Sequence, residues 1–164
     1  QIRDFDFNAK LLSIERTAWR PSGTTTPKVK PGTKNGKIRT ISITDNVVNE
    51  VKSHIKWMEM YWKWYVKKPL TDEQYILFDP RDLGPIHFGA SESRFMTLLR
   101  QTGLNKYGRS FKSLRHTHAT WLLSEGETLD RVAHRLGHSS RNITYEYYRT
   151  FSPKDHDSVR AKFE

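Results

Sequence analysis

The sequence predicts an α+β fold that is mostly α-helical and carries a small antiparallel β-sheet. Segments rich in β-compatible residues fall before residue 45, whereas helical spacing of apolar residues dominates the rest of the chain. Glycine and proline separate these segments. The 164 residues suit one domain, and a hydrophobic content of 35% is enough for a packed core.

Two strands are predicted near the start, at residues 10–19 and 38–43. From Arg16 to Arg39 there are seven basic residues and no acidic one. The simplest interpretation is a β-hairpin with a basic loop. The lysines of that loop are Lys28, Lys30, Lys34 and Lys37.

Asp45 can cap a long helix that runs to about Lys68 and is ended by Pro69. Its core face is predicted to consist of Val48, Val51, Ile55, Met58, Trp62 and Tyr65. A second aromatic stripe is formed by Trp57, Tyr61 and Trp64. This stripe leaves two interpretations open: a helix that is buried on two sides, or contact with another domain or subunit.

The rest of the chain is predicted to be helical after a short extended segment and a loop. The extended segment is 75–78 and the loop is 79–89. Gly137 is expected to close the third of the following helices. The expected helices are Ser91 or Ser93 to Leu99, 111 or 112 to 125, 129–136, and 142–148.

A formal net charge of +10 and a pI near 9.9 indicate a polyanionic partner, with nucleic acid ahead of an acidic membrane surface. The absence of cysteine excludes disulfide scaffolds, iron–sulfur clusters and cysteine nucleophiles. No apolar run is long enough for a membrane span, and no signal peptide is recognisable. A second basic run, which has no acidic residue, comprises Arg94, Arg100, Lys106, Arg109, Lys112 and Arg115.

Histidines are crowded in the second half of the chain, which raises the question of a metal site. His134 and His138 have the spacing of two ligands on one helix, but Arg135 stands where a metalloprotease would have glutamate. Gly137 is also expected to end the helix before His138. We therefore predict no metal site.

Four motifs, in order along the chain, resemble the catalytic domain of tyrosine recombinases, the phage integrase family. Residues 111–120 read FKSLRHTHAT, residues 136–138 read LGH, and Thr144 and Tyr147 follow at the family's spacing. Near the start, residues 4–7 read DFDF and residues 33–41 read TKNGKIRTI. The first of these segments is similar to the one that precedes the family's first strand, and the second is similar to the segment bearing its hairpin lysine.

The resemblance implies a role for each matching residue. Tyr147 would be the nucleophile that forms a 3′-phosphotyrosine, with Tyr148 as the second choice. Arg115 would bind the non-bridging phosphate oxygens, and His138 would bind the same phosphate or assist proton transfer. Lys34 would protonate the leaving 5′-oxygen, with Lys37 as the alternative.

Two departures from the family pattern bear on activity. Lys112 stands where the family usually has histidine in the motif at residues 111–120. A lysine can still donate to a phosphate oxygen as a charged group. The family's first catalytic arginine lies upstream of the segment that opens this chain, which begins with Gln1. We therefore expect residues 1–150 to be an N-terminally truncated catalytic domain, 151–164 to be a C-terminal tail, and this piece alone to be inactive.

The function that the resemblance implies is site-specific DNA recombination by a prophage or mobile-element integrase, without a metal or nucleotide cofactor. Its partners would be double-stranded attachment sites, a tetramer on DNA formed from free monomers, and accessory factors. The expected location is the bacterial cytoplasm, at the nucleoid. The alternatives are a non-catalytic DNA-binding relative or regulator and a type IB topoisomerase-like enzyme, against which the LGH box argues. The remaining DNA contacts are expected from Lys28, Lys30, Lys37, Arg94, Arg100, Lys106 and Arg109.

Overall fold

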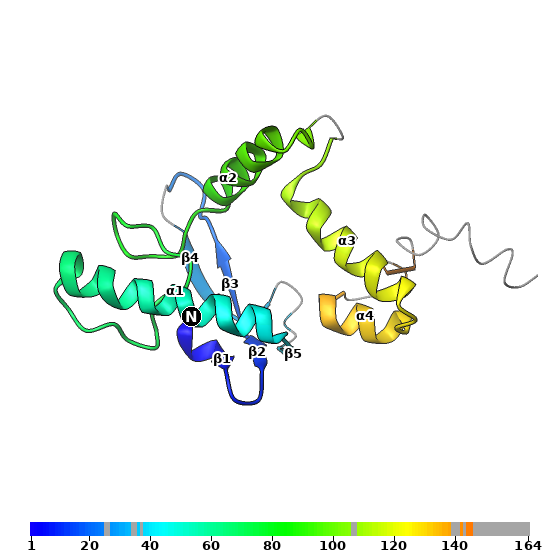
Figure 1. Ribbon diagram of the computed structural model, residues 1–164, viewed down its shortest axis with the longest axis horizontal. Coiled ribbons are helices and arrows are strands. Elements are labelled where there is room, and N and C mark those ends of the chain that lie inside the picture. Colours follow the sequence, from blue (N-terminus) through cyan, green and yellow to red (C-terminus); the bar gives the residue numbers. More distant parts are fainter. Residues whose placement is uncertain are drawn as a thin grey trace, which may run out of the picture. The chain divides into compact units, whose positions relative to one another are not determined.

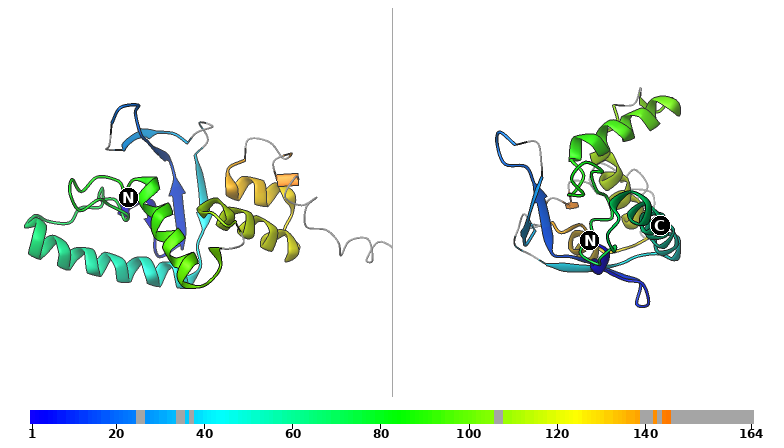
Figure 2. Two further views of the ribbon diagram at one scale, coloured as in Figure 1. Left: turned by 90° about the horizontal axis from the view of Figure 1, so that it is seen from above. Right: turned by 90° about the vertical axis from the view of Figure 1, so that its left-hand side faces the viewer.

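The structure is a computed structural model, and it confirms the predicted α+β class (Figures 1 and 2). It describes residues 1–24, 27–33, 36, 38–105, 108–138, 142, 144 and 145. The chain divides into two compact units, Gln1–Ser91 and Glu92–Glu164. Each unit is described by itself.

The first unit contains two small antiparallel sheets (Figure 1). A 3-10 turn, η1 (Ile2–Asp4), leads into the three-stranded sheet, in which the central strand β2 pairs with both neighbours. The second sheet is a two-stranded ribbon. The three-stranded sheet has the order β1 (Phe5–Asp6), β2 (Leu11–Ile14) and β5 (Arg39–Ser42), and the ribbon pairs β3 (Arg16–Trp19) with β4 (Lys28–Pro31).

The single strand predicted over 10–19 is wrong in one respect, because it is interrupted at Glu15. The resulting strands, β2 and β3, pair with different partners. The Glu15 carbonyl accepts the Gly32 N–H at 2.7 Å, which closes the base of the ribbon. The region predicted to be a basic loop therefore includes a strand. Val29 is the only β-branched residue within β4, so its β-signal is weak.

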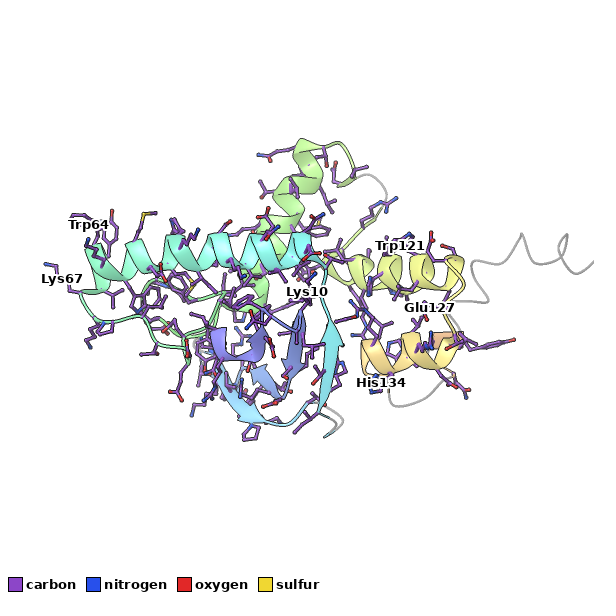
Figure 3. The ribbon with its side chains drawn as sticks, turned by 60° about the horizontal axis from the view of Figure 1, so that its bottom comes forward. Lys10, Trp64, Lys67, Trp121, Glu127 and His134 are labelled. Carbon is purple, nitrogen blue, oxygen red and sulfur yellow. The ribbon has the colours of Figure 1, made fainter. Side chains whose placement is uncertain are left out.

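Helix α1 (Asp45–Tyr61) begins where it was predicted to begin, but Thr44 caps it instead of Asp45. The Thr44 hydroxyl accepts the Val47 N–H at 3.4 Å. Asp45 pairs with Lys10 at 2.8 Å, and Figure 3 shows Lys10 beside this end of the helix. The helix continues as one π-helical stretch, η2 (Trp62–Val66), and stops at Lys67, which adopts a left-handed conformation with φ of 55°.

The core of the first unit lies between the last turns of α1 and the segment over residues 70–86. Met58 is fully buried, and Trp62 meets Phe78 edge-on, with ring centroids 4.8 Å apart. The buried residue Ile2 joins this cluster. The extended segment predicted over 75–78 contributes through a bridge between Phe78 and Pro85.

Three aromatic positions of α1 and η2 differ from the prediction. Trp57 and Trp64 are 45% and 68% exposed, so burial on two sides is wrong for them (Figure 3 shows Trp64). Tyr65, which was predicted to face the core, is 75% exposed. The π-helical stretch explains the exposure of Tyr65. Its wider turn rotates the side chains that follow Trp62 away from the helix face on which Met58 is buried.

The second unit is helical. Helix α2 (Phe88–Gln101) begins earlier than predicted, and the boundary between the units falls within it. The His87 imidazole caps its start by accepting the Gly89 N–H at 3.0 Å. The prediction of a start at Ser91 or Ser93 did not include this histidine cap. Helices α3 (Phe111–Ser124) and α4 (Leu129–Leu136) match their predicted positions.

A small core joins α3 and α4, which lie side by side (Figures 1 and 2). Ala119 of α3 and Val132 and Leu136 of α4 are buried, with Leu122 and Leu123 packed against them. Trp121 lies on the other side of α3 and is 58% exposed (Figure 3). This buried contact therefore holds the C-terminal end of α4 against the face of α3 that carries Ala119.

Among the helices that the structure describes, none has the length and apolar character that crossing a bilayer requires.

We predict that Met58→Ala lowers the free energy of unfolding by about 2–5 kcal/mol, because it leaves a cavity beneath Trp62 and Phe78. Met60, which is 57% exposed on the same helix, is the matched control, and Met60→Ala should change stability by less than about 0.5 kcal/mol. Urea unfolding monitored by circular dichroism measures both changes. Equal losses from the two substitutions would contradict the assignment of the core.

Candidate active site

The end of α4 has a fixed backbone geometry. Gly137 adopts a left-handed conformation with φ of 71°, which is strained for residues with a Cβ. Its N–H donates to the His134 carbonyl at 3.0 Å, and the His138 N–H donates to the Ala133 carbonyl at 2.9 Å. These two bonds form a Schellman motif, which holds His138 immediately beyond the helix.

Arg115 reaches this helix end from α3. One guanidinium N–H donates to the Leu136 carbonyl at 2.6 Å, and the side chain is half-buried. The carbonyls at a helix C-terminus carry partial negative charge, so the position suits a cation. Within the residues that the structure describes, Arg115 forms no ion pair with a carboxylate.

The guanidinium of Arg115 is thus brought to the residue that lies two positions before His138. A guanidinium carries five N–H groups in a planar fork, and the Leu136 carbonyl takes only one of them. An anion held by this fork would lie close to the segment that bears His138. The structure therefore brings together two of the residues that the sequence singled out.

The ring of His138 is oriented by a buried hydroxyl. Its Nδ1 lies 2.8 Å from Oγ1 of Thr144, a residue with 0% exposure. Because Nδ1 is engaged there, the other ring nitrogen, Nε2, points to the opposite side of the imidazole. Sequence reasoning used Thr144 only as part of a spacing pattern and assigned it no contact.

A second polar contact joins α3 to α4. Arg135 donates from Nε to Nε2 of His118 at 3.0 Å, so this imidazole accepts in its neutral form. Burial and, secondarily, the positive charge of Arg135 lower the pKa of His118 below its usual value of 6.5. His118 thus has a structural role, as a polar link between α3 and α4. His116 is exposed and does not pack inside.

Lys112 lies in the first turn of α3, three residues before Arg115 and exposed. Side chains at this spacing are neighbours on a helix surface. The turn is held by the Ser110 N–H, which donates to Oγ of Ser113 at 3.0 Å. Lys112 is thus available to a ligand that Arg115 binds.

The other predicted site residues fall into two groups. Lys28, Lys30, Arg94, Arg100 and Arg109 are exposed, and the Lys30 ammonium lies 5.9 Å from the centre of the Trp19 ring. The second group lies outside the described residues and consists of Tyr147, Tyr148, Lys34, Lys37 and Lys106.

Among the described residues, no group of three or more histidine, aspartate or glutamate side chains is arranged to hold a metal ion. The predicted short helix over 142–148 is described only at residues 142, 144 and 145, which are helical.

An arginine from α3 thus lies at the C-terminal end of α4, and a histidine lies just beyond that end. The family model of the phage integrase family matches residues 1–154. The chain belongs to this family.

Solved structures with a similar fold include three of the Tn1549 transposon integrase in complex with DNA. One holds transposon right-end DNA (19% identity, TM-score 0.71), and two hold circular intermediate DNA (18% and 19% identity, TM-scores 0.70 and 0.72). In each case the alignment covers 98% of this chain, and it covers 50%, 50% and 51% of the other chain, respectively. The chain thus spans about half the length of these proteins. No curated protein sequence matches it significantly.

We predict that the thermal stability of the protein falls as the pH drops below about 6.5. The pKa of His118 is lowered in the folded state, so the unfolded chain takes up a proton first and is favoured as the pH falls. Melting temperatures at about pH 7.5 and about pH 5.5 measure the effect. In His118→Gln, whose amide oxygen can still accept from Arg135, this fall should be smaller, and an unchanged fall would contradict the assignment.

Proposed function

We propose that this chain is the catalytic part of a site-specific DNA recombinase that cuts and rejoins strands through a phosphotyrosine. The observation that carries the proposal is the hydrogen bond from Arg115 to the Leu136 carbonyl, which brings a phosphate-binding fork beside the segment of His138. Family membership over residues 1–154 supports the same chemistry.

In this mechanism the Tyr147 hydroxyl attacks the scissile phosphorus of DNA. The tyrosine oxygen forms a bond to phosphorus as the bond to the 5′-oxygen breaks, which leaves a 3′-phosphotyrosine and a 5′-hydroxyl. Attack by a 5′-hydroxyl on the phosphotyrosine reverses these steps and rejoins a strand. Bond energy is conserved in the covalent intermediate, so the reaction consumes no nucleotide.

The other proposed catalytic side chains each stabilise a charge or transfer a proton during strand cleavage. The Arg115 fork and Lys112 neutralise the non-bridging oxygens as charge builds on them. His138, through Nε2, donates to the same phosphate or takes the tyrosine proton. Lys34, or Lys37 in its place, protonates the departing 5′-oxygen.

Each unit is proposed to contribute contacts to DNA. On β4, Lys28 and Lys30 alternate with Val29, so both lysines lie on the face of the ribbon that also carries Trp19. Their exposure suits contacts with the phosphate backbone, which account for most of the affinity for DNA irrespective of sequence. The other proposed contacts are Lys37, Arg94, Arg100, Lys106 and Arg109.

The proposed assembly follows the family. The partner is double-stranded DNA with attachment sites, on which free monomers form a tetramer and accessory factors act. The catalytic domain comprises residues 1–150, and the tail over 151–164 packs on its own protomer or on a neighbour. Such a protein would act on DNA in the bacterial cytoplasm.

Replacing Tyr147 by Phe in the full-length protein should abolish the covalent protein–DNA adduct, because no hydroxyl remains to attack. Binding of the same DNA should change less than about twofold, since the phenyl ring is kept. A nicked suicide substrate followed by a denaturing gel measures the adduct. A persistent adduct would reject Tyr147 as the nucleophile, and DNA binding without an adduct in the wild type would favour a non-catalytic relative.

The double substitution of Lys28 and Lys30 by Gln should weaken DNA binding and reduce the slope of log affinity against log salt by about 2, because two phosphate contacts are lost. The matched control is the double substitution of Lys63 and Lys67 by Gln, which removes the same charge from exposed positions at the end of η2. Fluorescence anisotropy with labelled duplex over a salt series measures both slopes. Equal slope changes in the two variants would reject the ribbon as a DNA contact.

A further inference from the structure

We propose that Thr144 is a positioning residue that orients the imidazole of His138 and lets it work as both donor and acceptor. The proposal deepens the recombinase function proposed above and rests on it. It concerns a residue for which neither the family pattern nor the predicted chemistry supplies a role.

The first support is the contact itself. The hydroxyl of Thr144 is fully buried and lies 2.8 Å from Nδ1 of His138. A buried hydroxyl is stable only when it is hydrogen-bonded, and the His138 ring provides that partner. Within the described residues, no buried side-chain nitrogen or oxygen lacks a hydrogen-bond partner, so the contact belongs to a fully satisfied interior.

The second support is how tightly the backbone of His138 is held. The Schellman motif at Gly137 fixes its N–H, and the bond to Thr144 removes rotation about the side chain. These two constraints fix the direction in which Nε2 points relative to α4. Arg115 is bonded to the same helix end through the Leu136 carbonyl, so both side chains are positioned by the end of α4.

The third support is chemical. A hydroxyl donates one hydrogen and accepts through its lone pairs, so it can bond Nδ1 whether or not that nitrogen carries a proton. When Thr144 donates, Nε2 carries the proton and can bond a phosphate oxygen. When Thr144 accepts from the Nδ1–H, Nε2 carries no proton and can take one from a tyrosine. A carboxylate at this position would instead hold the proton on Nδ1 and raise the pKa of the ring.

Thr144 lies between the two proposed catalytic residues in the sequence, six residues after His138 and three residues before Tyr147. The hydrogen bond therefore ties the segment that leads to the proposed nucleophile to the ring that would assist its proton transfer. A loss of the hydroxyl should affect cleavage more than DNA binding.

The test uses Thr144→Val and Thr144→Ser in the full-length protein, each with and without His138→Ala. Valine keeps the shape and loses the hydroxyl, whereas serine keeps the hydroxyl. Thr117→Val is the matched control, because the Thr117 hydroxyl bonds only a helical carbonyl, that of Ser113, at 3.0 Å. The readouts are the rate of adduct formation on a suicide substrate across pH, and the tautomer and pKa of His138 from nitrogen-15 NMR.

We expect Thr144→Val to slow adduct formation by roughly tenfold with DNA affinity retained, and Thr144→Ser to restore the rate to within about twofold. In the His138→Ala background, Thr144→Val should have no further effect. The NMR signal of His138 should change its tautomer balance and pKa in Thr144→Val and not in Thr117→Val.

Three results would overturn the proposal. They are an equal slowing of adduct formation by Thr144→Val in the His138→Ala background, a Thr144→Ser rate as low as that of Thr144→Val, or an unchanged tautomer balance and pKa of His138 in Thr144→Val. The recombinase function is tested separately by the wild-type protein. If the wild type forms no adduct, that function fails, and the NMR comparison alone then decides whether Thr144 positions the ring.

Discussion

The C-terminal end of α4 is the constraint on which the candidate site depends. A single backbone conformation at Gly137 closes the helix, directs His138 out of it, and leaves the Leu136 carbonyl to be met by Arg115. The core that joins α3 to α4 holds the two helices close enough for that bond. Main-chain geometry therefore places Arg115 and His138 at the same end of α4.

The proposed reaction relies on side chains of the protein for the charges and protons it needs. A phosphodiester needs positive charge on its non-bridging oxygens and a proton for its leaving oxygen. In the proposed mechanism Arg115 and Lys112 provide the first, and a lysine of the hairpin provides the second. Thr144 completes the arrangement by keeping His138 aligned whichever ring nitrogen carries the proton.

Sequence reasoning succeeded where the signal is local. The positions of α3 and α4, and the glycine that ends α4, follow from helical spacing and from the known preference for glycine beyond a helix. It failed where partners come from elsewhere in the chain. The segment of β4 was predicted to be part of a loop because pairing with β3, not composition, makes Lys28–Pro31 a strand. The bonds from Arg115 to Leu136 and from His138 to Thr144 were also beyond it, since spacing alone reports no contact.

The central claim is that Arg115 and His138 hold a phosphate for attack by Tyr147. The most direct measurement is to trap the full-length protein on a nicked suicide substrate, digest the denaturant-stable complex, and identify the nucleotide-bearing peptide by mass spectrometry. The account predicts that the nucleotide is attached to Tyr147. Attachment at another residue, or tight DNA binding with no attached nucleotide, would contradict it.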